Sequence, residues 1–354
     1  MKNAKNLKGC FFVEKNKSVT GKSFDAIDFC KFIFSIAVIA LHTNFLGNYN
    51  ENISFFIISI WCRLAVPFFF AVTGFLLCLK LIAKKEQSAE TIKKQCYRMT
   101  LLWALWSGIK FIHCILRGII KQENIINIVK EYIKNIIILQ DGNLWYIQIL
   151  ILSLPLFYLF YKNNKTVVFF VLSLILYETR VVFSYLSLFE SSFTPLYNML
   201  ENTIFFFDFW RSCVFISVGT MVAIKYANIN KDKIFNQKEK IWLIVAIPIF
   251  LLEILSIIIY SKDRNIAYFA LFPLIIYCFL CFLVDSKVKI NKARLFRELS
   301  ILMYVSHYLV RSVCHPLHNI SSLLYFFATL VLTVLFSYSI IVLSKQYKVL
   351  KYLY

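Results

Sequence analysis

The chain has 354 residues, of which 60% are hydrophobic and 18% are aromatic. Soluble domains average roughly 45–50% apolar residues, so this composition excludes an ordinary soluble enzyme and indicates a protein that resides in lipid. The formal net charge of +20 would favour a nucleic-acid partner in a soluble protein. We expect no such partner, because the basic residues gather in alternate loops between apolar segments.

About ten apolar segments are long enough to cross the hydrocarbon core, which takes about 20 residues per helix. Their length and the lack of period-two alternation favour helices over barrel strands. The predicted fold class is therefore an all-α integral membrane protein, and the scarcity of Gly (8) and Pro (6) indicates a single domain without a flexible linker. The predicted spans are residues 28–47, 53–82, 97–119, 143–161, 166–185, 204–225, 241–260, 266–284, 299–317 and 321–344.

The distribution of Lys and Arg predicts the topology. The loops on the side of the N-terminus carry 27 of these residues and the opposite side carries 7, which places both chain ends in the cytoplasm by the positive-inside rule. Residues 1–27 form a basic cytoplasmic segment with no signal-peptide pattern, residues 28–344 form the ten-helix domain, and residues 345–354 form a short basic tail. We expect a multi-pass protein of the cell (plasma) membrane.

Two outer loops differ in character. Residues 120–142 place Ile, Val and Leu at helical spacing, which predicts an amphipathic helix on the outer surface; a solvated connector is the alternative. Residues 186–203 interleave aromatic side chains with Glu190 and Glu201 and could cover a polar cavity that opens outward.

Polar side chains in the first span offer the clearest functional signal. Asp28, Lys31 and His42 interrupt an otherwise apolar helix. Lys31 and His42 are eleven residues apart, which is three turns plus about 20°, so they share one face about 16 Å apart along the axis. A cytoplasmic cation and an outward-lying base then lie along one stripe. Snorkelling of Lys31 and interfacial hydrogen bonding by His42 are the simpler alternatives.

The second span carries Arg63 near the middle of the bilayer, where a guanidinium requires a partner, water or an anionic ligand. Pro67 and the Thr73-Gly74 pair could bend or open this helix.

Other polar groups are explained more simply as structural. The third span carries a basic stripe of Lys110, His113 and Arg117, and in the sixth span Asp208 and Arg211 can neutralise each other. Glu253 is a carboxyl group in the middle of its span, and His307, with Tyr304 three residues before it, can pack between helices.

The ten cysteines fall mostly within apolar segments and read as small buried thiols. Cys278 and Cys281 form a CxxC with no second pair to complete a zinc site. We therefore expect no metal.

Four segments together resemble membrane acyltransferase family 3: IDFCKFIFSIAVIALHT, RLAVPFFFAVTGFLL, NLWYIQILI and ELSILMYVSHYLV. The resemblance covers residues 25 to 320. The most specific motif of the family is a basic residue followed eleven positions later by histidine, met here by Lys31 and His42. The family usually has Arg at the first position, and Lys31 cannot reproduce its bidentate phosphate binding.

Further motifs match in part. Arg63 corresponds to the arginine before the Val-Pro-Phe-Phe stretch, and Trp145 belongs to the Leu-Trp motif. His307 takes the place of the late histidine, with Tyr304 before it. We expect Asp28, Trp145, Tyr304 and His307 to surround the site, in contact with the substrate or with the catalytic residues.

What the resemblance implies is transfer of an acyl group, usually acetyl, from cytoplasmic acyl-CoA to a hydroxyl of an extracytoplasmic cell-envelope glycan or small acceptor. Acyl-CoA would be a co-substrate, bound near Lys31, Arg98 and the basic inner loops, and no cofactor is expected to be bound permanently. His42 would act as general base or carry the acyl group briefly, and Arg63 would stabilise the oxyanion.

Two alternatives stay open. A related ten-helix module precedes the racemase domain of membrane-bound serine racemases, where it is thought to take up the amino acid, so the intramembrane charges could line a transport path. A structural or flippase-like partner in a cell-envelope assembly is the third interpretation.

Overall fold

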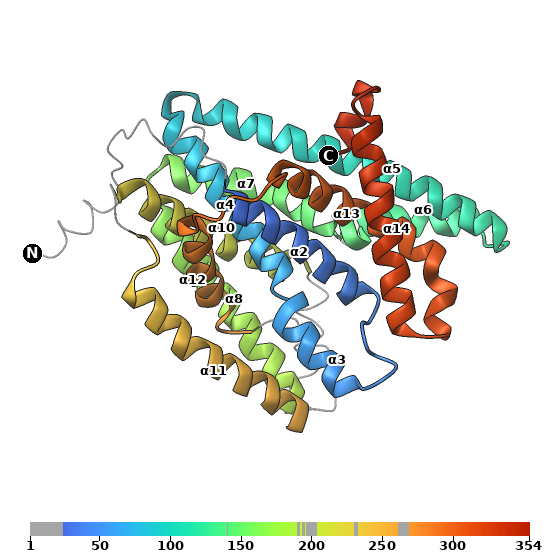
Figure 1. The fold of residues 1–354 in the computed structure, drawn as a ribbon, viewed down its shortest axis with the longest axis horizontal. Coiled ribbons are helices and arrows are strands. Elements are labelled where there is room, and N and C mark those ends of the chain that lie inside the picture. Colours follow the sequence, from blue (N-terminus) through green and yellow to red (C-terminus); the bar gives the residue numbers. More distant parts are fainter. Residues whose placement is uncertain are drawn as a thin grey trace, which may run out of the picture.

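The computed structural model describes residues 24–139, 141–189, 192, 195, 204–229, 233–260 and 269–354. Every regular element in these ranges is helical, which confirms the all-α prediction (Figure 1). The elements are α2 (Asp25–His42), α3 (Glu51–Ile57), η2 (Ile58–Cys62), α4 (Ala65–Ala83), η3 (Lys85–Gln87), α5 (Ser88–Ile120), α6 (Ile125–Ile137), η4 (Gly142–Leu144), α7 (Trp145–Lys162), α8 (Thr166–Phe189), α10 (Ile204–Asn228), α11 (Gln237–Tyr260), α12 (Phe272–Asp285), α13 (Ala293–Cys314), η6 (His315–Asn319), α14 (Ser322–Leu343) and η7 (Lys348–Leu353). Most of the predicted segment 1–27 and of the loop 186–203 lies outside the described residues.

At least one helix overlaps each of the ten predicted spans. Among the residues that the structure describes, six helical stretches are long and apolar enough to cross a membrane by length and composition alone: Glu51–Ala83, Lys85–Ile120, Ile125–Lys162, Thr166–Leu186, Gln237–Tyr260 and Ser322–Leu343. Helices α2 and α13 are not in this group, because charged residues interrupt their apolar sequences.

Among the predicted boundaries that differ from the structure, two concern α2 and α13. Helix α2 ends at His42 rather than at residue 47, because Asn44 (φ 52°) and Leu46 (φ 63°) adopt left-handed backbone conformations that end a helix. Helix α13 begins at Ala293 rather than at residue 299, since its first two turns are polar and carry an exposed Arg294–Glu298 pair. His42 therefore lies at a helix C-terminus.

The predicted second span is not one continuous helix. It consists of α3, the π-helical segment η2 and α4, and a turn at Arg63–Leu64 separates η2 from α4. Pro67 has no N–H to donate to the carbonyl of Arg63, and its ring would clash with that carbonyl in a regular helix. The break therefore lies four residues before the proline, at Arg63.

Helices α4 and α10 form the centre of the bundle (Figure 1). In the most apolar 18 residues of Glu51–Ala83, 67% of the residues are buried, whereas the corresponding share in Lys85–Ile120 is 17%. A Cβ atom on Gly74 would lie 2.2 Å from the carbonyl oxygen of Ile216, and one on Gly219 would lie 1.8 Å from that of Ala71. Two glycines on facing helices thus allow the backbones to touch, as small residues do in membrane helix pairs. Gly74 is a packing residue rather than the bend that the sequence suggested.

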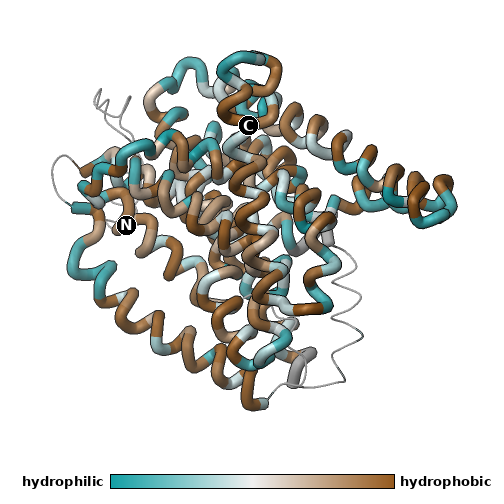
Figure 2. The backbone as a smooth tube through the Cα atoms, turned by 45° about the vertical axis from the view of Figure 1, so that its right-hand side comes forward, coloured by the Kyte–Doolittle hydropathy of each residue, from teal (hydrophilic) through white to brown (hydrophobic). Residues whose placement is uncertain are grey.

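Helices α5 and α6 extend from one side of the bundle, and apolar stretches run along the outer helices (Figures 1 and 2). The predicted amphipathic helix in residues 120–142 is confirmed as α6, which exposes Ile126, Ile133 and Ile137. The C-terminal residues fold back against α5, where the Trp106 indole N–H donates to the carbonyl of Leu353 at 2.9 Å. The tail is therefore part of the packed structure.

We predict that Gly219→Ala destabilises the protein by about 1–3 kcal/mol, because the added methyl group overpacks the contact with α4. The measurement is the melting temperature of the purified protein in detergent. Gly108→Ala is the matched control, since a Cβ at Gly108 meets no atom within 4 Å. Equal melting temperatures for the two variants would contradict the close α4–α10 contact.

Candidate active site

Helices α2 and α13 lie against each other in parallel. At their N-terminal ends Asp28 lies 3.5 Å from Arg297. At their C-terminal ends the rings of His42 and His307 stack with centroids 5.2 Å apart and planes 25° apart. The predicted stripe of Lys31 and His42 therefore faces α13 and not lipid.

The two imidazoles form the centre of the candidate site. His307 is 1% exposed, and its Nδ1 lies 2.7 Å from the carbonyl oxygen of Tyr304 and 3.2 Å from that of Met303. A carbonyl oxygen only accepts, so Nδ1 must carry a proton to make this hydrogen bond. The lone pair of neutral His307 is then on Nε2, which leaves a basic atom for proton transfer.

A cation lies beside this pair. Arg311 Nη1 donates to the carbonyl of His42 at 3.0 Å, and the Tyr325 hydroxyl donates to the carbonyl of Arg311 at 3.3 Å. The guanidinium satisfies a carbonyl at the C-terminus of α2, where a positive charge is favourable. Arg311 was not among the candidate residues that the sequence suggested, although it is four residues after His307 and so on the same face of α13.

The other end of the stripe is a cluster of charges. Lys31 Nζ lies 3.2 Å from Asp28 Oδ1, and both side chains are largely buried. Lys80 and Arg297 are like-charged neighbours of Lys31, and Arg98 is a neighbour of Lys80. The structure therefore gathers the predicted donor-binding residues at one end of the bundle. It also gives Lys31 an acidic partner.

Arg63 lies in a different environment. Its guanidinium is 5.0 Å from the centre of the Phe55 ring, and the Tyr185 hydroxyl is an electrostatic neighbour. Tyr185 donates a hydrogen bond to Glu253. The described contacts of Arg63 are thus with an aromatic ring and a tyrosine, and its predicted role beside His42 stays a prediction.

Trp145 contacts the predicted neutralising pair of α10. Arg211 Nη2 lies 2.7 Å from Asp208 Oδ1, which confirms the pairing, and the Arg211 guanidinium is 4.7 Å from the centre of the Trp145 ring. Trp145 thus packs against a cation rather than beside the histidines.

Tyr304 connects the histidines to the segment before α7. Its hydroxyl donates to the carbonyl of Asn143, and Asn143 Nδ2 donates to the carbonyls of Tyr304 and Val305, each at 3.4 Å. The Tyr304 and Tyr146 rings meet edge to face at 5.4 Å. The structure therefore brings the Leu-Trp motif next to the late tyrosine-histidine motif.

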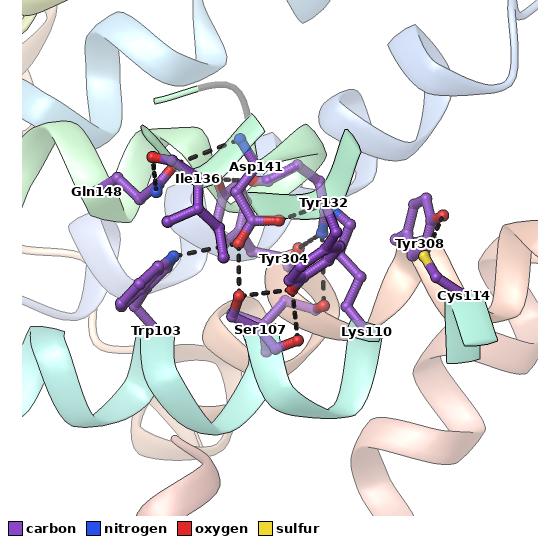
Figure 3. Close-up of polar contacts among 12 residues, drawn as sticks. Trp103, Ser107, Lys110, Cys114, Tyr132, Ile136, Asp141, Gln148, Tyr304 and Tyr308 are labelled. Atoms are coloured by element: carbon purple, nitrogen blue, oxygen red, sulfur yellow. Dashed lines mark hydrogen bonds and ion pairs between the residues drawn. The ribbon is translucent and has the colours of Figure 1, made fainter. Parts of the chain in front are cut away.

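The sequence interpretation missed Asp141. This buried carboxylate pairs with Lys110 at 2.6 Å (Figure 3), so Lys110 belongs to an ion pair and not to a free basic stripe. The only sequence signal was an acidic residue just before the Leu-Trp motif. Within the described part of the chain, no group of three or more His, Cys, Asp or Glu side chains could hold a metal ion.

Comparison of the sequence with known proteins identifies the family of this chain. A family model described as an acyltransferase domain matches residues 24–342. An amino-acid racemase from Enterococcus faecalis is 27% identical over 202 residues, a match that covers 55% of this chain and only 27% of the racemase. No solved structure matches the chain. Because the family match spans nearly the whole sequence and includes both histidines, the chain belongs to acyltransferase family 3.

Proposed function

We propose that the protein transfers an acyl group, most simply acetyl, from cytoplasmic acyl-CoA to a hydroxyl group of a cell-envelope glycan or small acceptor on the far side of the plasma membrane. The observation that carries the proposal is the stacked pair of half-buried His42 and buried His307 in a chain of acyltransferase family 3. The pair supplies a base at one end of α2, and the charges around Lys31 supply an anion-binding surface at the other end.

The proposed topology has ten spans with both chain ends in the cytoplasm. Helices α2 and α13 are parallel, as a first and a ninth span would be. Phe24 contacts Phe75 and Phe34 contacts Phe68, so α2 and α4 are antiparallel, as a first and a second span would be. These directions agree with the distribution of Lys and Arg.

The proposed reaction requires one base and one oxyanion donor. His42 removes the proton of the acceptor hydroxyl, whose oxygen attacks the thioester carbonyl carbon; the C–S bond then breaks, and the CoA thiolate leaves with that proton. In a second form of the mechanism, His42 carries the acyl group before the acceptor receives it. Stacking against His307 holds the plane of the His42 ring.

Two guanidinium groups are candidates for stabilising the oxyanion. The role of Arg63 rests on the resemblance, whereas Arg311 is the guanidinium that the described contacts place beside His42. Either donor would stabilise the negative charge that develops on the carbonyl oxygen in the transition state.

We predict that His42→Ala lowers the rate of acyl transfer by about 10²- to 10⁴-fold, the usual contribution of a general base, while the protein remains folded. The assay uses purified protein in vesicles, with acyl-CoA on the cytoplasmic side and surface glycans as acceptors on the other side. Mass analysis of the glycans measures the acyl groups transferred. His315→Ala is the control, because His315 is exposed on η6. Wild-type rates in folded His42→Ala would refute the assignment.

We predict that Lys31→Ala raises the KM for acyl-CoA more than it lowers kcat, because Lys31 would contact the donor and not the acceptor. Lys31→Arg should lower this KM, since a guanidinium can bind phosphate in a bidentate manner. Titration of acyl-CoA at a fixed acceptor concentration measures both effects. An unchanged donor KM in Lys31→Ala would place the donor elsewhere.

A second candidate function is amino-acid uptake, which the match to an amino-acid racemase favours. Vesicles that contain the protein would then accumulate labelled serine in the absence of acyl-CoA. Uptake without acyl transfer would replace the first proposal, and the charges along α2 would line a transport path.

A further inference from the structure

Asp141 and Lys110 form a buried ion pair away from the two histidines. Asp141 is 1% exposed, and Lys110 Nζ lies 2.6 Å from its Oδ1. The Ser107 hydroxyl and the Trp103 indole N–H donate to Oδ2 at 2.8 and 3.2 Å. One carboxylate thus accepts hydrogen bonds from three side chains on a single face of α5 (Figure 3).

This arrangement is poorly explained as a source of stability. Desolvation of two charges offsets most of their attraction, and replacement of a buried pair by apolar residues is often neutral or stabilising. What the pair does achieve is geometric. All three donors belong to α5, whereas the acceptor lies outside any helix, just before η4 and α7. The pair therefore fixes the position of residues 141–144 relative to α5.

Two further contacts hold the same segment. The Asp141 N–H donates to Gln148 Oε1 at 3.3 Å, and Gln148 Nε2 donates to the carbonyl of Ile136 on α6 at 3.3 Å. Gly142 has a φ of +53°, and a Cβ there would lie 2.7 Å from Lys110 Nζ. Glycine adopts this left-handed conformation without strain, and it has no Cβ atom to occupy the space of the Lys110 ammonium group.

The other side of this segment touches the candidate site. Asn143, two residues after Asp141, accepts from the Tyr304 hydroxyl and donates to the carbonyls of Tyr304 and Val305. The carbonyl of Tyr304 is also the acceptor for His307 Nδ1 at 2.7 Å. Only Gly142 and Asn143 thus lie between Asp141 of the buried ion pair and Tyr304, whose carbonyl orients the His307 imidazole.

We propose that Asp141 and Lys110 are positioning residues for His307: their ion pair holds Asn143 against Tyr304, and Tyr304 in turn fixes the tautomer and direction of the His307 ring. The catalytic consequence rests on the proposed function. The geometric consequence, a His307 ring held by this segment, does not.

The test uses the full chain in detergent and in vesicles, with Asp141→Asn, Lys110→Met and the double variant. The first readout is the rate at which diethyl pyrocarbonate modifies His307, measured by peptide mass mapping with exposed His315 as the internal standard. The second is the steady-state kinetics of acyl transfer. Lys225→Met is the matched control, because Lys225 pairs with largely buried Glu239 at the same 2.6 Å separation and has no described contact with the histidine site.

Both single variants should modify His307 severalfold faster than the wild type, whereas Lys225→Met should not. In acyl transfer kcat should fall by about 100-fold, as expected for a misplaced catalytic group, with little change in the donor KM. If no acyl transfer occurs in the wild type, the proposed function fails and the modification rate still decides the positioning role.

Asp141→Asn and Lys110→Met could lose as much thermal stability as Lys225→Met and yet leave the modification rate of His307 unchanged. That result would overturn the inference and leave the ion pair a purely structural role. If the charge variants do not fold, Tyr304→Phe provides the second route, since it keeps the ion pair and removes the hydrogen bond to Asn143. Its His307 should also be modified faster, and an unchanged rate there would overturn the inference equally.

Discussion

The constraint on which this structure depends is the cost of a charged group in a low-dielectric interior. Such a charge persists only with a partner, so each buried cation selects which elements lie side by side. Asp28 pairs with Lys31 on its own helix and with Arg297 of α13, and so joins α2 to α13. Lys110 with Asp141 joins α5 to the segment before α7, and Lys225 with Glu239 joins α10 to α11. The ion pairs thus specify helix neighbours in a bundle whose apolar surfaces are alike.

Close backbone packing completes what the charges specify. Hydrophobic burial gives little preference among helices in lipid, so association depends on packing and hydrogen bonds. The Gly74 and Gly219 contacts bring α4 and α10 together at backbone distance. Against this central pair α2 presents an apolar side, where Phe34 meets Phe68 of α4, while its polar stripe faces α13. One helix thereby contributes to the core with one face and to the site with the other.

The sequence predicted the helices well and the helix neighbours poorly. Long apolar segments report burial in lipid, so a helix overlaps each predicted span. A histidine at membrane depth is conspicuous enough to make His42 a candidate. Contacts between distant segments leave no such signal. Asp141 reads as an ordinary loop acid, Arg311 as an interfacial cation, and the break at Arg63 requires knowing that Pro67 removes one specific hydrogen bond. The Lys31 and His42 stripe was predictable because it lies on a single helix.

The position of His42 at the end of α2 has a consequence for catalysis. The last carbonyls of a helix lack intrahelical donors, and Arg311 satisfies that of His42. The two imidazoles therefore come from different helices: the carbonyl of His42 accepts from Arg311 of α13, whereas His307 is held by the carbonyls of its own helix and, through Tyr304, by Asn143. A small displacement of α2 along α13 would separate the rings and break the hydrogen bond from Arg311, while the bonds that hold His307 would remain. The relative placement of these two parallel helices, which the charges at their opposite ends control, is thus the coordinate to which the candidate site is most sensitive.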